Sequence, residues 1–283
     1  MSISYNRGHG KRHRGEPLKT RNPKHKTRHA GSGRDRRPDK SLGQHFLKDQ
    51  NILAIEAELA DPEGKIVLEV GPGDGRLTDA VLAKNPAKLI AIEKDPRFAQ
   101  MLREKYSGSR KIEIIEGDFL EVPLPESVDV VVGNIPYYIS SGIVFHLRYI
   151  RFGRGVLMVQ KEFAEKMVAK PGERNYGRLS VTSQLAFDIK FERKVLRHLF
   201  RPPPEVDSAI IVIRPTGFRA SQLQENIIRW LFQHRNKTVR NALLDSKMFK
   251  DEDLAAISHY LKRRARELSK EECLDIAKRL ENV

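Results

Sequence analysis

Cysteine is almost absent from this chain of 283 residues, which contains only Cys273. A single thiol excludes an intramolecular disulfide and any zinc site built on cysteine ligands. The sequence also lacks a run of about 18 apolar residues, the length that crosses a bilayer, and its first 20 residues lack the apolar core of a secretory signal. These absences predict a cytoplasmic protein with no membrane segment and no metal site.

Acidic residues are fewer than basic ones: the chain has 37 Asp and Glu and 52 Lys and Arg, which gives it a net charge of +15. The first 40 residues carry +10 of this excess and the other 243 carry only +5. Residues 1–38 are rich in Arg, Lys, His, Gly and Pro and contain few large apolar side chains, which predicts a disordered basic arm. Such an arm favours contact with nucleic-acid phosphates, although it could also be a solubilising tail.

Between residues 41 and 214, short apolar runs alternate with helical patterns. The predicted strands are residues 66–70, 89–92, 112–115, 128–132, 156–159 and 209–213. The predicted helices are residues 77–83, 98–105, 143–149 and 179–187. Strands that are apolar throughout are typical of sheets covered on both faces. The alternation therefore predicts an α/β fold, with a Rossmann-like, doubly wound and mainly parallel sheet.

The pattern changes near the C-terminus, after the Pro202-Pro203-Pro204 run and the last predicted strand. Residues 221–283 show helical periods only, with breaks near residues 245–251 and 268–270. We therefore expect three parts: a basic arm (1–38), a cofactor-binding catalytic domain (39–216) and a small α-helical domain (217–283).

A glycine-rich turn follows the first predicted strand, with Gly71, Gly73 and Gly75 in a G-x-G-x-G spacing. Glycines let the backbone pass close beneath a ligand, so Gly71 and Gly73 are candidate cofactor contacts. Glu93 and Asp118 end the next two predicted strands. An acid at the position of Glu93 can accept hydrogen bonds from the ribose hydroxyls of a nucleoside cofactor. Singly, each acid could be a turn or cap residue; the spaced set favours a binding site.

The glycine spacing argues against a dinucleotide-binding dehydrogenase. That class has G-x-G-x-x-G, and here Arg76 stands at the position of the third glycine. The compact spacing resembles the first motif of class I S-adenosylmethionine-dependent methyltransferases.

The run Asn134-Ile135-Pro136-Tyr137 ends the fourth predicted strand and indicates the substrate. The lone pair of the adenine N6 amine is delocalised into the ring, and a site can make the nitrogen more nucleophilic by accepting hydrogen bonds from both N6–H groups. The Asn134 oxygen and a backbone carbonyl held by Pro136 suit this role. Tyr137 offers a flat face for an unpaired base. The alternative is an incidental turn with a core tyrosine.

Together these motifs resemble those of the ribosomal RNA small-subunit adenine N6-dimethyltransferase family. The segments that carry the resemblance are residues 42–47, 134–141, 200–208 and 233–243. The resemblance implies methylation of two adjacent adenosines near the 3′ end of small-subunit rRNA, within an immature ribosomal subunit. No feature demands more than a monomer.

The resemblance also implies roles for individual residues. It places cofactor contacts at Gln44, His45, Leu47, Gly71, Glu93, Asp118 and Asn134. It places the target adenine between Tyr137 and Phe200, and Phe200 could otherwise be a core residue. Bacterial members commonly have Asn where this chain has His45, which suggests an archaeal or eukaryote-like branch. In the helical domain Arg235, Lys237 and Arg240 form a basic face that could contact RNA or simply be solvated.

Two alternatives stay open at this point. One is a related methyltransferase of the antibiotic-resistance class, which acts on a single large-subunit rRNA adenosine. The other is a nucleic-acid-binding protein that keeps the fold without catalysis. The intact Gly71, Glu93, Asp118 and Asn134 argue against the latter.

Overall fold

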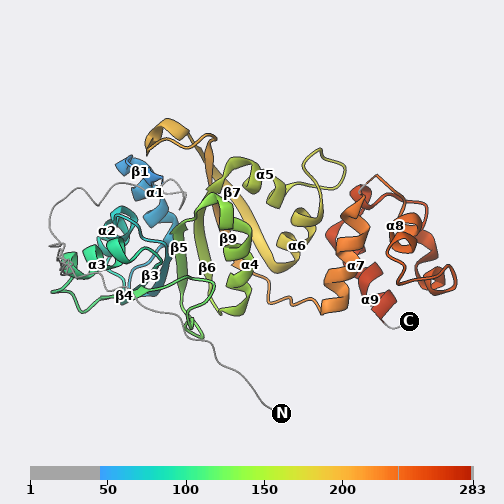
Figure 1. The fold of residues 1–283 in the computed structure, drawn as a ribbon, viewed down its shortest axis with the longest axis horizontal. Coiled ribbons are helices and arrows are strands. Elements are labelled where there is room, and N and C mark those ends of the chain that lie inside the picture. The colour runs from blue at the N-terminus through green and yellow to red at the C-terminus, as the bar shows by residue number, and fades with distance from the viewer. Residues whose placement is uncertain (1–44, 235, 282–283) are drawn as a thin grey trace, which may run out of the picture. The chain divides into compact units, whose positions relative to one another are not determined.

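The computed structural model describes residues 45–234 and 236–281. Its largest element is a seven-stranded sheet of order β4-β3-β2-β5-β6-β9-β7 (Figure 1). The first five strands in this order are parallel, and β9 runs antiparallel to both β6 and β7. The strands are β2 (Ile66–Val70), β3 (Lys88–Glu93), β4 (Ile112–Glu116), β5 (Val130–Asn134), β6 (Arg154–Gln160), β7 (Phe187–Val195) and β9 (Ser208–Pro215). The sheet is therefore mainly parallel, as predicted.

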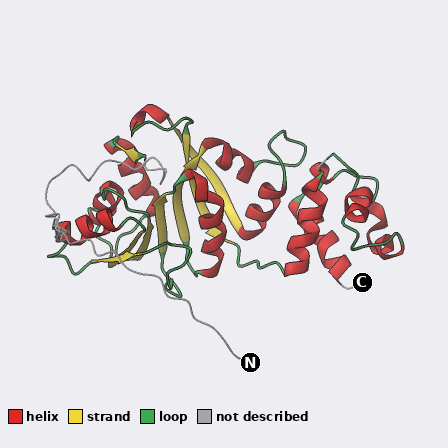
Figure 2. Cartoon of the chain, viewed as in Figure 1, coloured by secondary structure: helices red, strands yellow, loops and turns green. Residues whose placement is uncertain are grey.

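Helices cover both faces of this sheet (Figure 2). Successive residues of a strand point to opposite faces, and the apolar side chains divide accordingly. On one face the strands pack against α1 (Gln50–Ala60) and α2 (Arg76–Leu82). On the other they pack against α4 (Ser140–His146) and α5 (Lys161–Val168). The helix α3 (Pro96–Lys105) contacts β3 and β4. This arrangement is the doubly wound α/β fold that the sequence predicts.

A second, two-stranded sheet joins segments that are distant in the sequence. β1 (Phe46–Leu47) pairs antiparallel with β8 (Phe200–Arg201), and the Lys48 N–H donates to the Leu199 carbonyl at 2.8 Å. Arg76 donates to the Leu47 carbonyl at 3.2 Å, which ties β1 to the start of α2. The segment before α1 is thereby held close to the glycine-rich turn.

After β9 the described residues form helices and loops (Figure 2). These helices are α7 (Gln222–Gln233), α8 (Val239–Asp245), η5 (Glu252–Tyr260), η6 (Ala265–Glu267) and α9 (Lys270–Glu281). Their apolar side chains form a cluster that also contains Ala169, Tyr176 and Val181 from the preceding part of the chain. Tyr176 is buried, and its hydroxyl donates to the Leu268 carbonyl at 2.7 Å.

Some element predictions are wrong. The helix predicted at 179–187 ends at Ala186, because Phe187 begins strand β7, which was not predicted. The helices α1 and α5 were also missed. The strand predicted at 128–132 begins later, at Val130, and the helix predicted at 143–149 is α4 followed by the short 3-10 helix η3 (Leu147–Tyr149).

Among residues 45–234 and 236–281, no helix is long and apolar enough to cross a membrane.

Candidate active site

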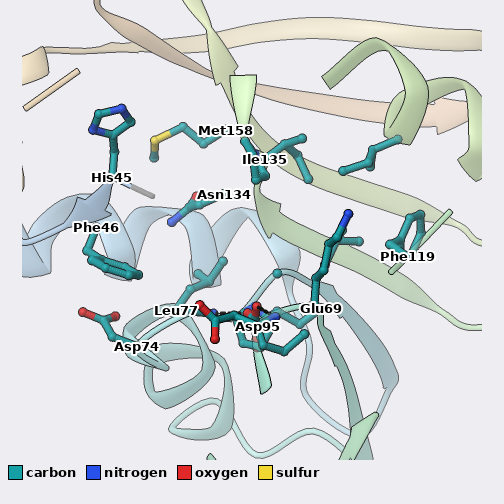
Figure 3. A pocket seen from close by; sticks show the side chains of 18 of the residues that line it. His45, Phe46, Glu69, Asp74, Leu77, Asp95, Phe119, Asn134, Ile135 and Met158 are labelled. Atoms are coloured by element: carbon teal, nitrogen blue, oxygen red, sulfur yellow. Dashed lines mark hydrogen bonds between the residues drawn. The ribbon is translucent and has the colours of Figure 1, made fainter. Parts of the chain in front are cut away.

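The strand order reverses between β2 and β5, and this reversal positions the site. From β2 the chain moves outward to β3 and β4, then returns to β5 on the other side of β2. The carboxyl ends of β2 and β5 are therefore neighbours, where open α/β sheets bind ligands. A pocket opens there, with about 1170 Å³ of empty space including its mouth. Figure 3 shows Asn134, Glu69, Asp74 and Phe46 among the side chains that line it.

The glycine-rich turn forms one wall of the pocket. Gly71 and Gly73 have φ angles of 65° and 55°, in the left-handed region that favours glycine. A Cβ atom on Gly73 would lie 2.8 Å from the Phe46 ring, so the turn and β1 fit closely only because this residue is glycine.

Glu93 supports this turn from the end of β3. One of its carboxylate oxygens accepts the Gly73 N–H and the other accepts the Asp95 N–H, both at 2.8 Å. Burial raises the pKa of Glu93, and these backbone hydrogen bonds act in the opposite direction. Each oxygen of a carboxylate can accept more than one hydrogen bond, so Glu93 can hold the turn and still accept from a ligand hydroxyl.

Asp118 stands at the end of β4 and is paired with a residue that was not predicted. Its carboxylate accepts a hydrogen bond from the Lys94 ammonium at 2.7 Å and one from the Leu120 N–H at 3.0 Å. The bond from Lys94 is the main reason that the pKa of Asp118 lies below its ordinary value. Asp118 therefore presents an ionised acceptor at the rim of the pocket.

Asn134 ends β5 and also lines the pocket. Its side-chain oxygen is buried and has no hydrogen-bond partner among the described residues. The next peptide leads into Pro136, whose carbonyl accepts the Ile139 N–H at 3.2 Å and the Ser140 hydroxyl at 3.1 Å. A buried, unpaired acceptor costs free energy unless a ligand uses it. The Asn134 oxygen is thus an unused acceptor in the pocket, as is one carboxyl oxygen of Glu69.

Two aromatic residues line the pocket together with Asn134. The Tyr137 hydroxyl is 2.5 Å from the Ser208 hydroxyl, and its ring stacks on His45 with centroids 6.1 Å apart. His45 in turn places a ring nitrogen 2.9 Å from the Pro202 carbonyl. Phe200 lines the pocket from β8 and is only 4 % exposed, so it belongs to the apolar core as well as to the pocket wall.

Two buried carboxyl groups near this pocket were not predicted from the sequence, Glu56 on α1 and Glu69 on β2. Burial raises the pKa of each to about 8. A signal for Glu56 existed, because Leu53, Glu56, Ala57 and Ala60 are spaced as one face of a helix, and a charged residue in such a stripe is unusual.

Of the remaining predicted site residues, some fall outside the described residues, two are on the surface away from the pocket, and one lines it. Gln44, Arg235 and the basic arm fall outside the described residues. Lys237 and Arg240 do not line the pocket; they are exposed and form ion pairs with Asp245 and Asp251, respectively. Leu47 is buried and lines the pocket with His45.

The sheet order and the pocket at its reversal define a class I methyltransferase fold, and two solved structures agree. A dimethyladenosine transferase from Plasmodium falciparum is 30 % identical, covers 82 % of this chain and 95 % of its own, and has a TM-score of 0.73. The 23S rRNA methyltransferase ErmE is 31 % identical, covers 83 % and 99 %, respectively, and has a TM-score of 0.64.

The chain belongs to the ribosomal RNA adenine dimethylase family, whose pattern matches residues 36–282. A probable ribosomal RNA small subunit methyltransferase A from Thermococcus onnurineus is 43 % identical over 85 % of this chain and 91 % of its own. A protein of the same name from Methanopyrus kandleri is 44 % identical over 74 % and 77 %. The chain is therefore an rRNA-modifying methyltransferase, as the motifs predict, and these relatives are archaeal.

Proposed function

We propose that the protein transfers methyl groups from S-adenosylmethionine to N6 of two adjacent adenosines near the 3′ end of small-subunit rRNA, giving N6,N6-dimethyladenosine during ribosome biogenesis. The observation that carries this proposal is the buried, unpaired side-chain oxygen of Asn134 in the pocket. An acceptor held at that point, beside the glycine turn, suits an amine that must be oriented for reaction.

The residues present fit a nucleoside cofactor. Gly71 and Gly73 bring the backbone close to the pocket, and Glu93 can accept from ribose hydroxyls while it holds the turn. Asp118 can accept from the amine of an adenine ring. His45 and Leu47 would close the pocket from the side of β1, and we expect Gln44 to assist them. When bound, S-adenosylmethionine supplies an electrophilic methyl group on a sulfonium with a good leaving group.

The chain's own part in the reaction is to orient the amine. The Asn134 side-chain oxygen accepts a hydrogen bond from one N6–H group. The second acceptor is the Ile135 carbonyl, because the Pro136 carbonyl already accepts from Ile139 and Ser140. Two such acceptors localise the lone pair on N6, which makes the nitrogen nucleophilic, and they direct this lone pair toward the methyl group. Tyr137 and Phe200 bracket the adenine ring.

The small-subunit substrate is supported by the names of the archaeal relatives, which match this chain at 43–44 % identity. ErmE, named for 23S rRNA, is 31 % identical. We further propose that the substrate is an immature subunit, that the protein acts as a cytoplasmic monomer, and that Lys237, Arg240 and Arg235 contact rRNA.

Transfer of labelled methyl groups to immature small subunits tests this function. We expect dimethyladenosine at two adjacent positions near the rRNA 3′ end, measured by mass spectrometry, and no labelling of large-subunit rRNA. Label in large-subunit rRNA alone would indicate the resistance class of methyltransferase. No transfer to either RNA would contradict the enzymatic proposal.

A substitution at Asn134 tests the chemistry. Asn134→Ala should bind S-adenosylmethionine within about threefold of wild type but lose about 100-fold or more in kcat, because it removes an acceptor that positions the amine. Calorimetry measures the first quantity and single-turnover methyl transfer the second. A variant with near wild-type turnover would show that Asn134 is not the acceptor.

A further inference from the structure

Glu56 is a buried carboxyl group that the reaction described above does not use. It lies in the stripe of α1 that packs against the sheet, and its side chain is 1 % exposed. Neither of its oxygens makes a hydrogen bond of standard geometry to any residue in the described part of the chain. Burying a carboxyl in this way costs free energy. A residue with this cost, next to a pocket, is a candidate for a functional role.

The helix α1, which carries Glu56, packs against β5, which ends at Asn134. Alternation along β5 places Asn134 on the same face as Val130 and Val132, and these valines pack in the apolar cluster that contains α1. Burial raises the pKa of Glu56 to about 8, and the Asn134 amide lowers it as a hydrogen-bond donor. The two polar side chains therefore belong to one buried layer, which also contains the Glu69 carboxyl of β2.

We propose that Glu56 is a positioning residue for methyl transfer: its carboxylate accepts a hydrogen bond from the Asn134 side-chain N–H, which leaves the Asn134 oxygen to accept from the adenine amine. This inference rests on the proposed function, because it assigns a purpose to the direction of the Asn134 amide. Glu56 touches neither substrate nor cofactor in this scheme; it acts through Asn134.

The ionised form of Glu56 is the one that orients Asn134 correctly. A carboxylate can only accept hydrogen bonds, so it selects the N–H end of the amide. A neutral carboxylic acid also has an O–H, which can donate to the Asn134 oxygen and compete with the adenine amine. Because the pKa of Glu56 is about 8, the ionised fraction, and with it kcat, should rise as pH increases through that region.

The charged group that acts on the ionisation of Glu56 is Glu69. The elements packed against α1 are α2, β5 and β6, with β2 in the same apolar layer. Asn134 is the polar residue of β5 that acts on Glu56, and Glu69 is the charged residue that raises its pKa. The charged residues on these elements are Glu69 on β2, Arg154 on β6, and Arg76 and Asp79 on α2. Arg154 donates to the Leu59 carbonyl, and Asp79 pairs with Lys105.

Two substitutions at Glu56 test the proposal in the full-length protein. Glu56→Gln should reduce the rise of kcat between pH 7 and 9, because glutamine does not ionise in this range and the Glu69 carboxyl is then the buried group that still titrates there. Glu56→Leu should lower kcat about tenfold at pH 9, because nothing then selects the direction of the Asn134 amide. In both variants KM for S-adenosylmethionine should stay within about twofold of wild type, since the cofactor contacts are intact.

Glu58→Gln is the matched control. Glu58 lies on the same helix but is exposed and paired with Lys84, so its replacement should leave both kcat and its pH profile unchanged. A double variant supplies the second control. If Glu56 acts through Asn134, adding Glu56→Gln to Asn134→Ala should change the remaining kcat by less than about twofold.

A measurement without turnover separates this inference from the proposed function. Carbon-13 labelling of glutamate and nitrogen-15 labelling of asparagine allow NMR titration of both side chains. The Glu56 carboxyl and the Asn134 amide should titrate with one shared midpoint, well above the usual glutamate range. In Glu56→Gln the Asn134 signals should no longer change with pH.

The outcomes are distinct. If wild-type protein transfers no methyl groups, the proposed function fails, and the NMR titration alone decides whether Glu56 governs Asn134. If wild type is active but Glu56→Gln keeps the pH dependence, or the Asn134 signals ignore the Glu56 titration, the positioning role is wrong. If Glu56→Leu does not fold, Glu56→Gln and the double variant still decide the question.

Discussion

At the scale of single residues, the acids at the strand ends were predictable but their partners were not. Glu93 and Asp118 follow apolar runs, and the carboxyl ends of parallel strands meet at one edge. The pairing of Asp118 with Lys94 depends on a loop conformation that no local pattern encodes. Glu56 was missed for a related reason, because its partner Asn134 is 78 positions away in the sequence.

Asp118 and Lys94 should contribute unequally to cofactor binding. Asp118→Asn should weaken S-adenosylmethionine binding about tenfold, the effect of losing one hydrogen bond to a charged acceptor. Lys94→Met should change it less than about threefold, because the Lys94 side chain is 55 % exposed and its ion pair is screened by solvent. The Leu120 N–H still holds Asp118 in that variant. Calorimetry at pH 7 measures both; a larger effect for Lys94→Met would assign it a direct contact.

At the scale of elements, the sequence predicted the strands that are apolar throughout but not β7, which is partly exposed. β7 alternates apolar Phe187, Ile189 and Phe191 with charged residues, and a bulge after Phe191 breaks the alternation before Val195. As an edge strand it has neighbours on one side only. Continuous apolar runs do not identify a strand of this kind. The helix predicted at residues 179–187 was therefore wrongly extended into the first residue of β7.

The strands β5 and β2 approach each other closely at Gly133, the residue before Asn134. A Cβ atom on Gly133 would lie 2.7 Å from the Val70 carbonyl oxygen, which is backbone and cannot move aside cheaply. Gly133→Ala should therefore destabilise the protein by about 1–3 kcal/mol, as overpacking does, and should reduce kcat because Asn134 follows directly.

Urea unfolding and methyl-transfer kinetics measure these two effects of Gly133→Ala. Gly108→Ala is the control, since its Cβ would meet no atom within 4 Å. Unchanged stability and turnover in Gly133→Ala would mean that the two strands can separate without moving Asn134.

At the scale of the whole molecule, the sequence predicted a helical C-terminal part but could not assign its packing partners. The cluster of α7, α8 and α9 includes Tyr176, and Tyr176 bonds to Leu268, 92 positions later. Composition changes after residue 215, yet apolar contacts extend back to Ala169. The division at residue 217 therefore stays a prediction, and limited proteolysis would locate the actual boundary.

The distribution of charge across the chain leads to the last prediction. Residues 1–38 hold two thirds of the net charge of +15, so we expect the arm to supply sequence-independent contacts to rRNA phosphates. Each phosphate neutralised by Lys or Arg releases condensed counterions, which makes binding depend on salt. Deleting residues 1–38 should weaken rRNA binding and reduce the slope of log K against log salt by about 3 to 5.

A second variant separates charge from length, because it keeps all 38 residues but replaces their Lys and Arg with Gln. Both variants should lose the same part of the salt dependence, while S-adenosylmethionine affinity stays at the wild-type value. Filter binding of rRNA between 50 and 300 mM salt measures the slopes. If both variants keep the wild-type slope, the phosphate contacts belong to the body of the protein, whose net charge is only +5. In that case the exposed Lys237 and Arg240, each now paired with an acid, would be the first contacts to test.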